Sequence, residues 1–444
     1  MRKAHICNKL ETVRVSARCV HYWPKMPDQQ AVLREAMRRL DLTRDAFAAR
    51  LGVTRRALDT WLLPAGSRQR RAMPEVVARM VASVLGPSAE AGQSLRPRLT
   101  RSGRPHLLSV DVFDRELAEE VMRVAEAMEP IARRQKVTRV LEGAVLGNLF
   151  FEPSTRTRVS FGAAFCRLGG AVCDTTGFTF SSMAKGESIA DTSRVISGYV
   201  DAVVVRHPEQ GSVAKFAAAT HVPVINGGDG PGEHPTQALL DLYTVRQEFA
   251  RLGKKLDGAH VAMVGDLRHG RTVHSLIRLL SLYRGMRFSL VAPAGLEMPP
   301  ELAGLARDRG HRVRESATPA EGVRNPDILY ATRIQKERMA GEGLEAYPAS
   351  FRIDRAAVKA LCAADTVILH PLPRDSTPGA NDLADDLDRD PRLAIFRQAD
   401  NGIPVRMAIF AILLGVEHLV ARTLRDAPWV SPARLRPYDR GQAT

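Results

Sequence analysis

Short apolar runs alternate with helical segments along most of the chain, and this alternation restricts the fold more than any other feature of the sequence. It is typical of parallel sheets covered by helices. A body of about 320 residues is too large for a single hydrophobic core, so the sequence predicts two parallel-sheet α/β domains. The strand-like runs are residues 144–151, 202–205, 222–225, 261–264, 288–291, 327–330 and 367–369.

Composition excludes several classes of protein. Hydrophobic residues make up 45% of the 444 residues and charged residues 25%, which excludes a wholly disordered chain. No apolar stretch of about 18 residues occurs, so we expect no membrane-spanning helix. The first 30 residues are basic and contain no apolar run, so we expect no secretory signal. Cysteine usage favours a cytoplasmic location. The five cysteines are odd in number and form no CxxC pair. We expect them to be small buried hydrophobes, with no disulfide or zinc site.

The net charge of +15 is concentrated at the front of the chain. Residues 1–107 contain 21 Lys and Arg against 8 Asp and Glu, a net charge of +13, and the remainder is almost neutral. Two segments of such different charge are expected to have different roles.

The sharpest motif is FFEPSTRTR at residues 150–158, where an apolar run ends and a helix begins. Backbone N–H groups at a helix N-terminus favour an anion, and hydroxyl and guanidinium donors fit phosphate oxygens. The alternative is an ordinary helix cap by Ser154 with exposed arginines.

Other polar residues follow the predicted strands. Arginines at a strand end point into the crevice where α/β proteins bind ligands. The alternative for each arginine is a solvated side chain at the strand end, and the alternative for the histidine is a structural role. In HPLP, residues 370–373, the Leu372–Pro373 bond is a candidate cis peptide. Four arginines with hydroxyls and a histidine together predict a site for a phosphate plus carboxylates. The residues are Arg156, Arg206, His234, Gln237, Arg271 and Arg333.

These motifs, in this order, resemble the catalytic chain of aspartate carbamoyltransferases, in the aspartate/ornithine carbamoyltransferase superfamily. The sister ornithine enzymes typically have Cys in place of Pro371 and lack the Arg-x-Gln formed here by Arg333 and Gln335, so the aspartate enzyme is favoured. Gly162 departs from the family, which usually has Glu there. The matching pieces are FFEPSTRTRVSF, SSMAKGESIADT, VVVRHP, GDGPGEHPTQALLDLYT, VAMVGDLRHGRTVHSL, ILYATRIQKER, ILHPLPR and QADNGIPVRMA.

The resemblance implies a role for each matching residue. Residues that hold carbamoyl phosphate are Ser154, Thr155, Arg156, Thr157, Arg206, His234, Gln237 and the backbone carbonyl of Leu372. Ser181 and Lys185 match residues that a neighbouring subunit lends to the same ligand, which implies a homotrimer or larger assembly. The aspartate-binding set is Arg271, Arg333 and Gln335.

The resemblance also implies domains and a reaction. The domains are a carbamoyl phosphate-binding domain at 107–243, an aspartate-binding domain at 244–400, a C-terminal helix at 401–425 packing back on the first domain, and a flexible tail at 426–444. The amine of aspartate attacks the carbonyl carbon of carbamoyl phosphate, and phosphate leaves. Thr157, Arg206 and His234 stabilise the carbonyl oxygen. The leaving phosphate can accept the amine proton, so no cofactor or metal is expected.

The basic front resembles a helix-turn-helix of the phage-repressor type. After an irregular segment at 1–27, the pattern of residues 28–86 is helical, and a Pro/Gly-rich linker at 87–106 follows. Thr43 and Thr54 are predicted caps and Gly52 the turn. Arg55, Arg56 and Asp59 would then lie exposed for DNA contacts. The alternative is a basic helical bundle used for assembly or partner docking.

Two other functions remain open from the sequence. One is transfer to ornithine or another amine. The other is a DNA-binding regulator whose transferase-like body has become a ligand sensor. A protein that only senses a ligand can tolerate the loss of some ligand-binding residues. All of the expected residues are intact here, which argues against a sensor.

Overall fold

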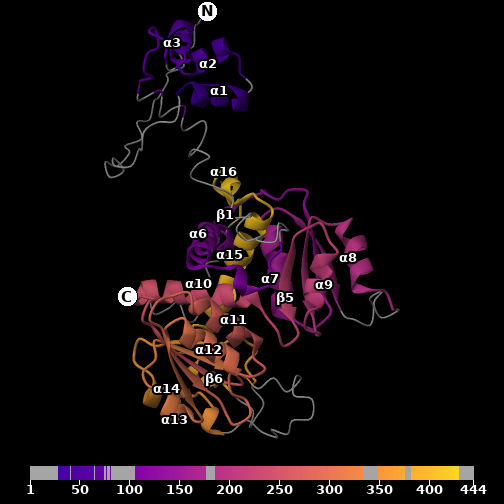
Figure 1. Cartoon of the computed structure of the whole chain (residues 1–444), viewed down its shortest axis with the longest axis vertical. Helices are drawn as coiled ribbons and strands as arrows, with labels where there is room; N and C mark the ends of the chain where they lie inside the picture. The colour runs from indigo at the N-terminus through magenta and orange to yellow at the C-terminus, as the bar shows by residue number, and fades with distance from the viewer. Residues whose placement is uncertain are drawn as a thin grey trace, which may run out of the picture. The chain divides into compact units, whose positions relative to one another are not determined.

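The chain forms two compact units, Met1–Gln93 and Ser94–Thr444, in this computed structural model (Figure 1). The structure describes residues 29–40, 42–64, 66–74, 77, 81, 106–176, 186–333, 349–375 and 382–429. The predicted segment 1–27 lies outside the described residues, as does the predicted linker except for His106.

In the part of the first unit that the structure describes, three short helices form the core. The Thr43 hydroxyl accepts a hydrogen bond from the Ala46 N–H, and the Thr54 hydroxyl accepts one from the Ala57 N–H. Gly52 between the helices has φ +64°. The predicted caps and turn are therefore confirmed. The helices are α1 (Gln29–Leu40), α2 (Arg44–Arg50) and α3 (Arg55–Trp61), and their core includes Leu33, Phe47, Leu58 and Trp61.

The second unit begins with a four-stranded parallel sheet in the order β3-β2-β4-β5. Alternate residues of its strands pack on opposite faces: Leu146 and Val204 join the core with α7, whereas Leu149 and Val203 pack with α9. Both faces are buried, so the central strands are continuously apolar in sequence. The strands are β2 (Val145–Phe150), β3 (Ala171–Thr176), β4 (Ala202–His207) and β5 (Val224–Asp229); the helices are α6 (Arg115–Ala132), α7 (Thr155–Arg167), α8 (Ile189–Ser197), α9 (Ser212–Ala218) and α10 (Pro235–Leu252).

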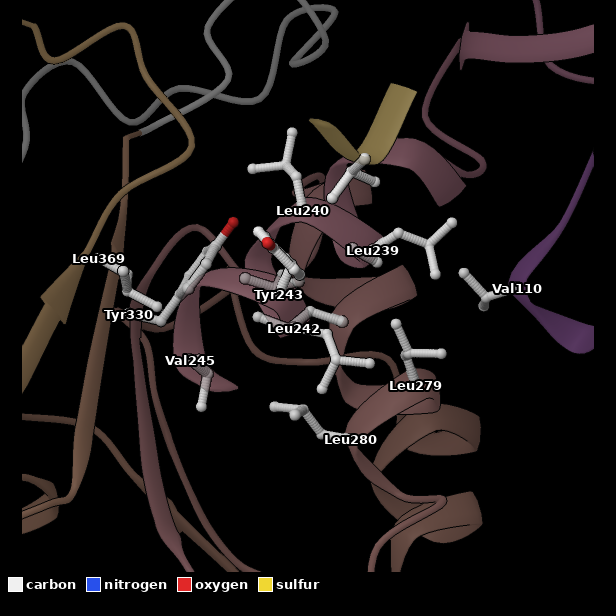
Figure 2. Close-up of a cluster of buried hydrophobic side chains, with 14 of the residues drawn as sticks. Val110, Leu239, Leu240, Leu242, Tyr243, Val245, Leu279, Leu280, Tyr330 and Leu369 are labelled. Carbon is white, nitrogen blue, oxygen red and sulfur yellow. The ribbon is translucent and has the colours of Figure 1, made fainter. Parts of the chain in front are cut away.

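A five-stranded parallel sheet follows, in the order β10-β9-β6-β7-β8. The long helix α10 packs against α11 and thereby connects the two layers. Figure 2 shows the leucines of α10 beside Leu279 and Leu280 of α11. The strands are β6 (His260–Gly265), β7 (Arg287–Val291), β8 (Arg312–Ser316), β9 (Ile328–Thr332) and β10 (Val367–Leu369); the helices are α11 (Arg271–Leu280), α12 (Pro300–Asp308), α13 (Pro319–Gly322) and α14 (Arg355–Leu361). Two parallel-sheet α/β domains were predicted, and this fold class is confirmed.

Helix α15 (Ile395–Leu413) returns to the first layer, where it packs against α6, α7 and α10 (Figure 1). The predicted C-terminal helix at 401–425 is wrong at both ends. The polar residues Arg397, Gln398, Asp400 and Asn401 hid the true start. The helix ends in a Schellman motif, because Gly415 has φ +71° and the Val416 N–H donates to the Ala411 carbonyl. The short α16 (Val420–Thr423) follows the break.

Among the described residues, no single helix is both long and apolar enough to cross a bilayer. By length and composition alone, α15 and the segment Glu417–Thr423 pass together, across a bend of 112°.

Two further expectations are wrong. Asp426, the first residue of the predicted tail, is in β11 (Arg425–Asp426), which pairs with β1 (Lys136–Val137). Cys166 and Cys173 are exposed, because one lies on the outer face of α7 and the other on the edge strand β3; Cys362 is buried. Residues 430–444 lie outside the described residues.

Gly265 allows β6 and β9 to approach closely. Its φ is +126°, and a Cβ atom would stand 2.0 Å from the Thr332 carbonyl oxygen. We expect Gly265→Ala to destabilise the protein by about 3 kcal/mol or more, from backbone strain and this clash. Gly304→Ala, on α12 with open space around it, is the control and is expected to add about 0.5–1 kcal/mol of stability. Thermal unfolding measures both, and equal melting temperatures for the two variants would contradict the close approach.

Candidate functional site

The predicted site residues stand at the carboxyl edges of the two sheets. Phe150 of β2 is opposite Arg206 of β4, so the start of α7 and the Arg206 side chain share one edge. In the second sheet Gly265 is opposite Thr332, and Arg333 follows directly. Carboxyl edges of parallel sheets are where α/β proteins bind ligands.

The N-terminus of α7 has free donors. Ser154 is the N-cap residue with extended backbone, yet its side chain makes no capping hydrogen bond, and the first turn contains no acidic residue. Thr155 and Arg156 are exposed, and Thr157 is half-buried. The pKa of Arg156 is lowered by burial and by the charge of Arg333, which places Arg333 near this terminus. An anion is the ligand that such a helix end favours.

Glu152 joins the arginines of the two sheets. Its Oε1 lies 3.0 Å from Nη2 of Arg206, and its Oε2 lies 3.3 Å from Nη1 of Arg271. Arg271 also donates to the Gly230 carbonyl at 2.7 Å. Burial, followed by repulsion from Arg206, lowers the pKa of Arg271 to about 10, so the guanidinium stays charged at neutral pH. Glu152 is part of the FFEPSTRTR motif, but no role was predicted for it from the sequence; its acidic side chain beside a basic motif was the signal.

Gly228 provides the space in which the two guanidinium groups lie. Its φ is +129°, and a Cβ atom there would be 3.0 Å from Nη1 of Arg206 and 3.0 Å from Cζ of Arg271. Any side chain at this position would displace one of the two groups.

His234 and Gln237 lie at the start of α10. His234 is the buried N-cap residue, and its backbone N–H donates to the Ser275 hydroxyl at 3.1 Å. Gln237 lies within the first turn, and its Nε2 donates to Asp241 Oδ1 at 2.8 Å. The loop before α10 is thus attached to α11, the helix that begins with Arg271.

Leu372 follows β10 and has an unusual backbone. Its φ is +53°, and the Leu372–Pro373 bond is cis, as the sequence predicted. Its N–H donates to Nδ1 of His370 at 2.9 Å, and His370 Nε2 lies 3.1 Å from Asp382. The aspartate and the backbone N–H together fix the tautomer of this histidine, with the proton on Nε2.

Among the described residues, the structure brings only part of the predicted set together. Glu152 links Arg206 with Arg271, and electrostatic repulsion links Arg156 with Arg333. Ser181, Lys185 and Gln335 lie outside the described residues.

The predicted DNA-contacting residues of α3 are paired with acids. Arg55 contacts Asp45 at 2.6 Å and Asp59 at 3.0 Å, and Asp59 also contacts Arg44 at 3.3 Å. Arg55 and Asp59 are half-buried, which corrects the prediction that both are exposed; Arg56 is exposed. The i, i+4 spacing of Arg55 and Asp59 on one helix explains their pairing.

Two family models match most of the second unit. "Aspartate/ornithine carbamoyltransferase, carbamoyl-P binding domain" matches residues 105–247, and "Aspartate/ornithine carbamoyltransferase, Asp/Orn binding domain" matches residues 257–413. The chain belongs to the aspartate/ornithine carbamoyltransferase family. This membership confirms the resemblance found in the sequence.

Individual proteins of the family are similar over the same extent. The aspartate carbamoyltransferase catalytic subunit of Dichelobacter nodosus is 58% identical over 312 residues, which are 70% of this chain and 90% of that protein. Aspartate transcarbamoylase from Trypanosoma cruzi, solved in complex with carbamoyl phosphate and aspartate, has a TM-score of 0.64 at 36% identity and covers 70% of this chain and 97% of its own. The catalytic subunit of M. jannaschii aspartate transcarbamoylase has a TM-score of 0.62 at 40% identity, with coverage of 70% and 98%.

Arg156 and Arg158 offer a matched test of anion binding at the α7 terminus. Arg158 contacts Asp174 at 3.6 Å, so its charge is already compensated. We expect Arg156→Ala to weaken the binding of inorganic phosphate by about tenfold or more, the effect of losing a charge-assisted hydrogen bond. Arg158→Ala should change the affinity by less than about twofold. Titration calorimetry measures both, and equal losses would contradict a specific role for Arg156.

Proposed function

We propose that the chain transfers the carbamoyl group of carbamoyl phosphate to the α-amine of L-aspartate. The products are N-carbamoyl-L-aspartate and phosphate, an early step of de novo pyrimidine biosynthesis in the cytoplasm. The observation that carries the proposal is the pair of arginines, Arg206 in β4 of the first sheet and Arg271 at the start of the helix after β6 of the second, that Glu152 joins. The D. nodosus protein, 58% identical, is named for this activity, and the T. cruzi structure contains both substrates.

Carbamoyl phosphate occupies the first sheet's edge in this proposal. Its phosphate lies at the N-terminus of α7, where Ser154, Thr155 and Thr157 supply hydroxyl or backbone donors and Arg156 supplies charge. Arg206 and His234 donate to the carbonyl oxygen, together with Thr157, and stabilise the negative charge that grows there as the amine attacks. Gln237 and the carbonyl of Leu372 accept from the carbamoyl amino group.

Aspartate occupies the second sheet's edge. Arg271, Arg333 and Gln335 hold its two carboxylates, and planar guanidinium groups suit carboxylates because they can donate two parallel hydrogen bonds. Holding both reactants in line makes the reaction effectively unimolecular, which is a large source of rate enhancement. The departing phosphate accepts the proton of the attacking amine, so the proposal assigns no protein base.

Arg333 is expected to make the protein prefer aspartate over ornithine as the acceptor amine. Ornithine has a cationic side chain where aspartate has a carboxylate, and Arg333 would repel it. Purified protein should therefore produce carbamoyl-aspartate in a carbamoyl-transfer assay with both amines side by side. Arg333→Ala should raise the KM for aspartate by about tenfold or more, and the KM for carbamoyl phosphate by much less. Faster turnover with ornithine than with aspartate would overturn the proposal.

The active site is shared between subunits of a trimer or larger assembly, in this proposal. Ser181 and Lys185 match residues lent across an interface, so one site combines Lys185 of one subunit with Arg271 of the next. Lys185→Ala and Arg271→Ala proteins should each be nearly inactive. Refolded together in equal amounts, they should recover up to about a quarter of the wild-type activity, because that share of shared sites in random hybrids carries neither change. Inactive mixtures in which mass spectrometry shows hybrids would rule out sharing.

A further inference from the structure

Asp241 is a fully buried carboxylate on α10, one turn after Gln237. Three side chains donate hydrogen bonds to it. Its Oδ1 accepts from Nε2 of Gln237 at 2.8 Å and from Nε2 of Gln398 at 2.6 Å, and its Oδ2 accepts from the Tyr330 hydroxyl at 2.8 Å. Hydrogen bonds to a buried carboxylate fix the orientation of the side chains that donate them.

An ionised carboxylate only accepts hydrogen bonds, and this fixes which way each glutamine amide faces. Burial raises the pKa of Asp241 to about 6, so the group is mostly ionised at neutral pH. Both glutamines must then present their NH2 groups to Oδ1. The Oε1 of Gln237 therefore points away from Asp241 as an acceptor.

The second glutamine connects Asp241 with the HPLP segment. Gln398 belongs to α15 and is buried. Its Oε1 accepts from the backbone N–H of His370 at 3.0 Å, and His370 in turn accepts the N–H of Leu372 through Nδ1 at 2.9 Å. One carboxylate thus stands behind two segments of the proposed carbamoyl phosphate site, Gln237 and Leu372.

We propose that Asp241 is a positioning residue that presents two oxygen acceptors, Oε1 of Gln237 and the backbone carbonyl of Leu372, to the amino group of carbamoyl phosphate. The inference rests on the proposed function. The amino group of the substrate is a donor with two hydrogens, so a pair of oxygens is the complement it requires. Without Asp241, Gln237 is free to turn its NH2 inward, which places a donor against a donor.

Acetyl phosphate provides a probe that a merely structural role does not affect. It has a methyl group where carbamoyl phosphate has NH2, and it keeps the same phosphate and carbonyl. The preference is measured as the inhibition constant of acetyl phosphate divided by the KM of carbamoyl phosphate. A site built to pair with an NH2 group rejects the analogue that lacks it, and loss of the acceptors must lower this ratio.

Three variants separate positioning from packing. Asp241→Ala should lower the preference by about tenfold or more, mainly through a higher KM for carbamoyl phosphate, with the acetyl phosphate constant nearly unchanged. Asp241→Asn should restore most of it, because the amide oxygen can accept from both glutamines while its NH2 faces the Tyr330 hydroxyl. Tyr330→Phe removes a hydrogen bond from the other oxygen of the same carboxylate. It should cost stability and leave the preference within about twofold of wild type.

The outcomes distinguish the two proposals. Wild-type protein without carbamoyl transfer to aspartate contradicts the proposed function. If the wild-type protein is active and Asp241→Ala keeps the wild-type preference for carbamoyl phosphate, the positioning role alone is contradicted. An equal fall of the preference in Asp241→Ala and Tyr330→Phe also contradicts the positioning role alone. If Asp241→Ala does not fold, Gln398→Met carries the test: it breaks the link to His370, and its preference should fall at least about threefold. An unchanged preference in folded Gln398→Met also overturns the inference.

Discussion

The carboxylate of Glu152 is the interaction on which the candidate site depends. Arg206 and Arg271 are buried, and each would repel the other if they faced one another alone. One acid between two guanidinium groups compensates half of their charge and leaves a single positive charge in excess. An anionic ligand can neutralise this remaining positive charge. Because Glu152 already pairs with both arginines, the unliganded protein does not have to bury two unpaired cations. Because Arg206 belongs to β4 and Arg271 begins α11, the helix after β6, the same contact also fixes how the edges of the two sheets face each other.

The continuously apolar strands could be predicted from the sequence, among them the edge strands β5 and β10, whereas the edge strands β3 and β8 could not. β4 and β6 are buried on both faces and are continuously apolar. The edge strands β3 and β8 carry polar or charged residues, because most of their residues are exposed to solvent. The charged sequence RVRES of β8 also blocks pairing with another chain at this edge. Hydrophobic patterns reveal burial, and strands that are only half covered give no such pattern.

The candidate site shows the same limit. Its arginines and the unusual backbone at Leu372 follow from motifs, since a motif places residue types at a strand end or a proline turn. Glu152, Asp241 and Gln398 each make a hydrogen bond to a residue far away along the chain, which no local spacing identifies, although the acidic Glu152 stood out beside its basic motif. Gln398 contributed to the wrong start of the predicted C-terminal helix, because a buried glutamine cannot be distinguished from a surface glutamine in a sequence. Only the folded chain shows that its amide reaches Asp241 across 157 residues.

The return of α15 to the first layer has a consequence for synthesis. Phe410 packs edge-on against Phe161 and Phe165 of α7, with ring centroids 5.9 and 4.9 Å away. A ribosome adds about 5–20 residues per second, so Phe410 is made about 12–50 seconds after α7. During that interval the apolar face of α7 that receives Phe410 lacks its cover. All strands of the second sheet and helices α11–α14 precede α15 in the chain. The second sheet can therefore be completed on the ribosome before the first layer. The first layer lacks its contacts with α15 until that helix has been made.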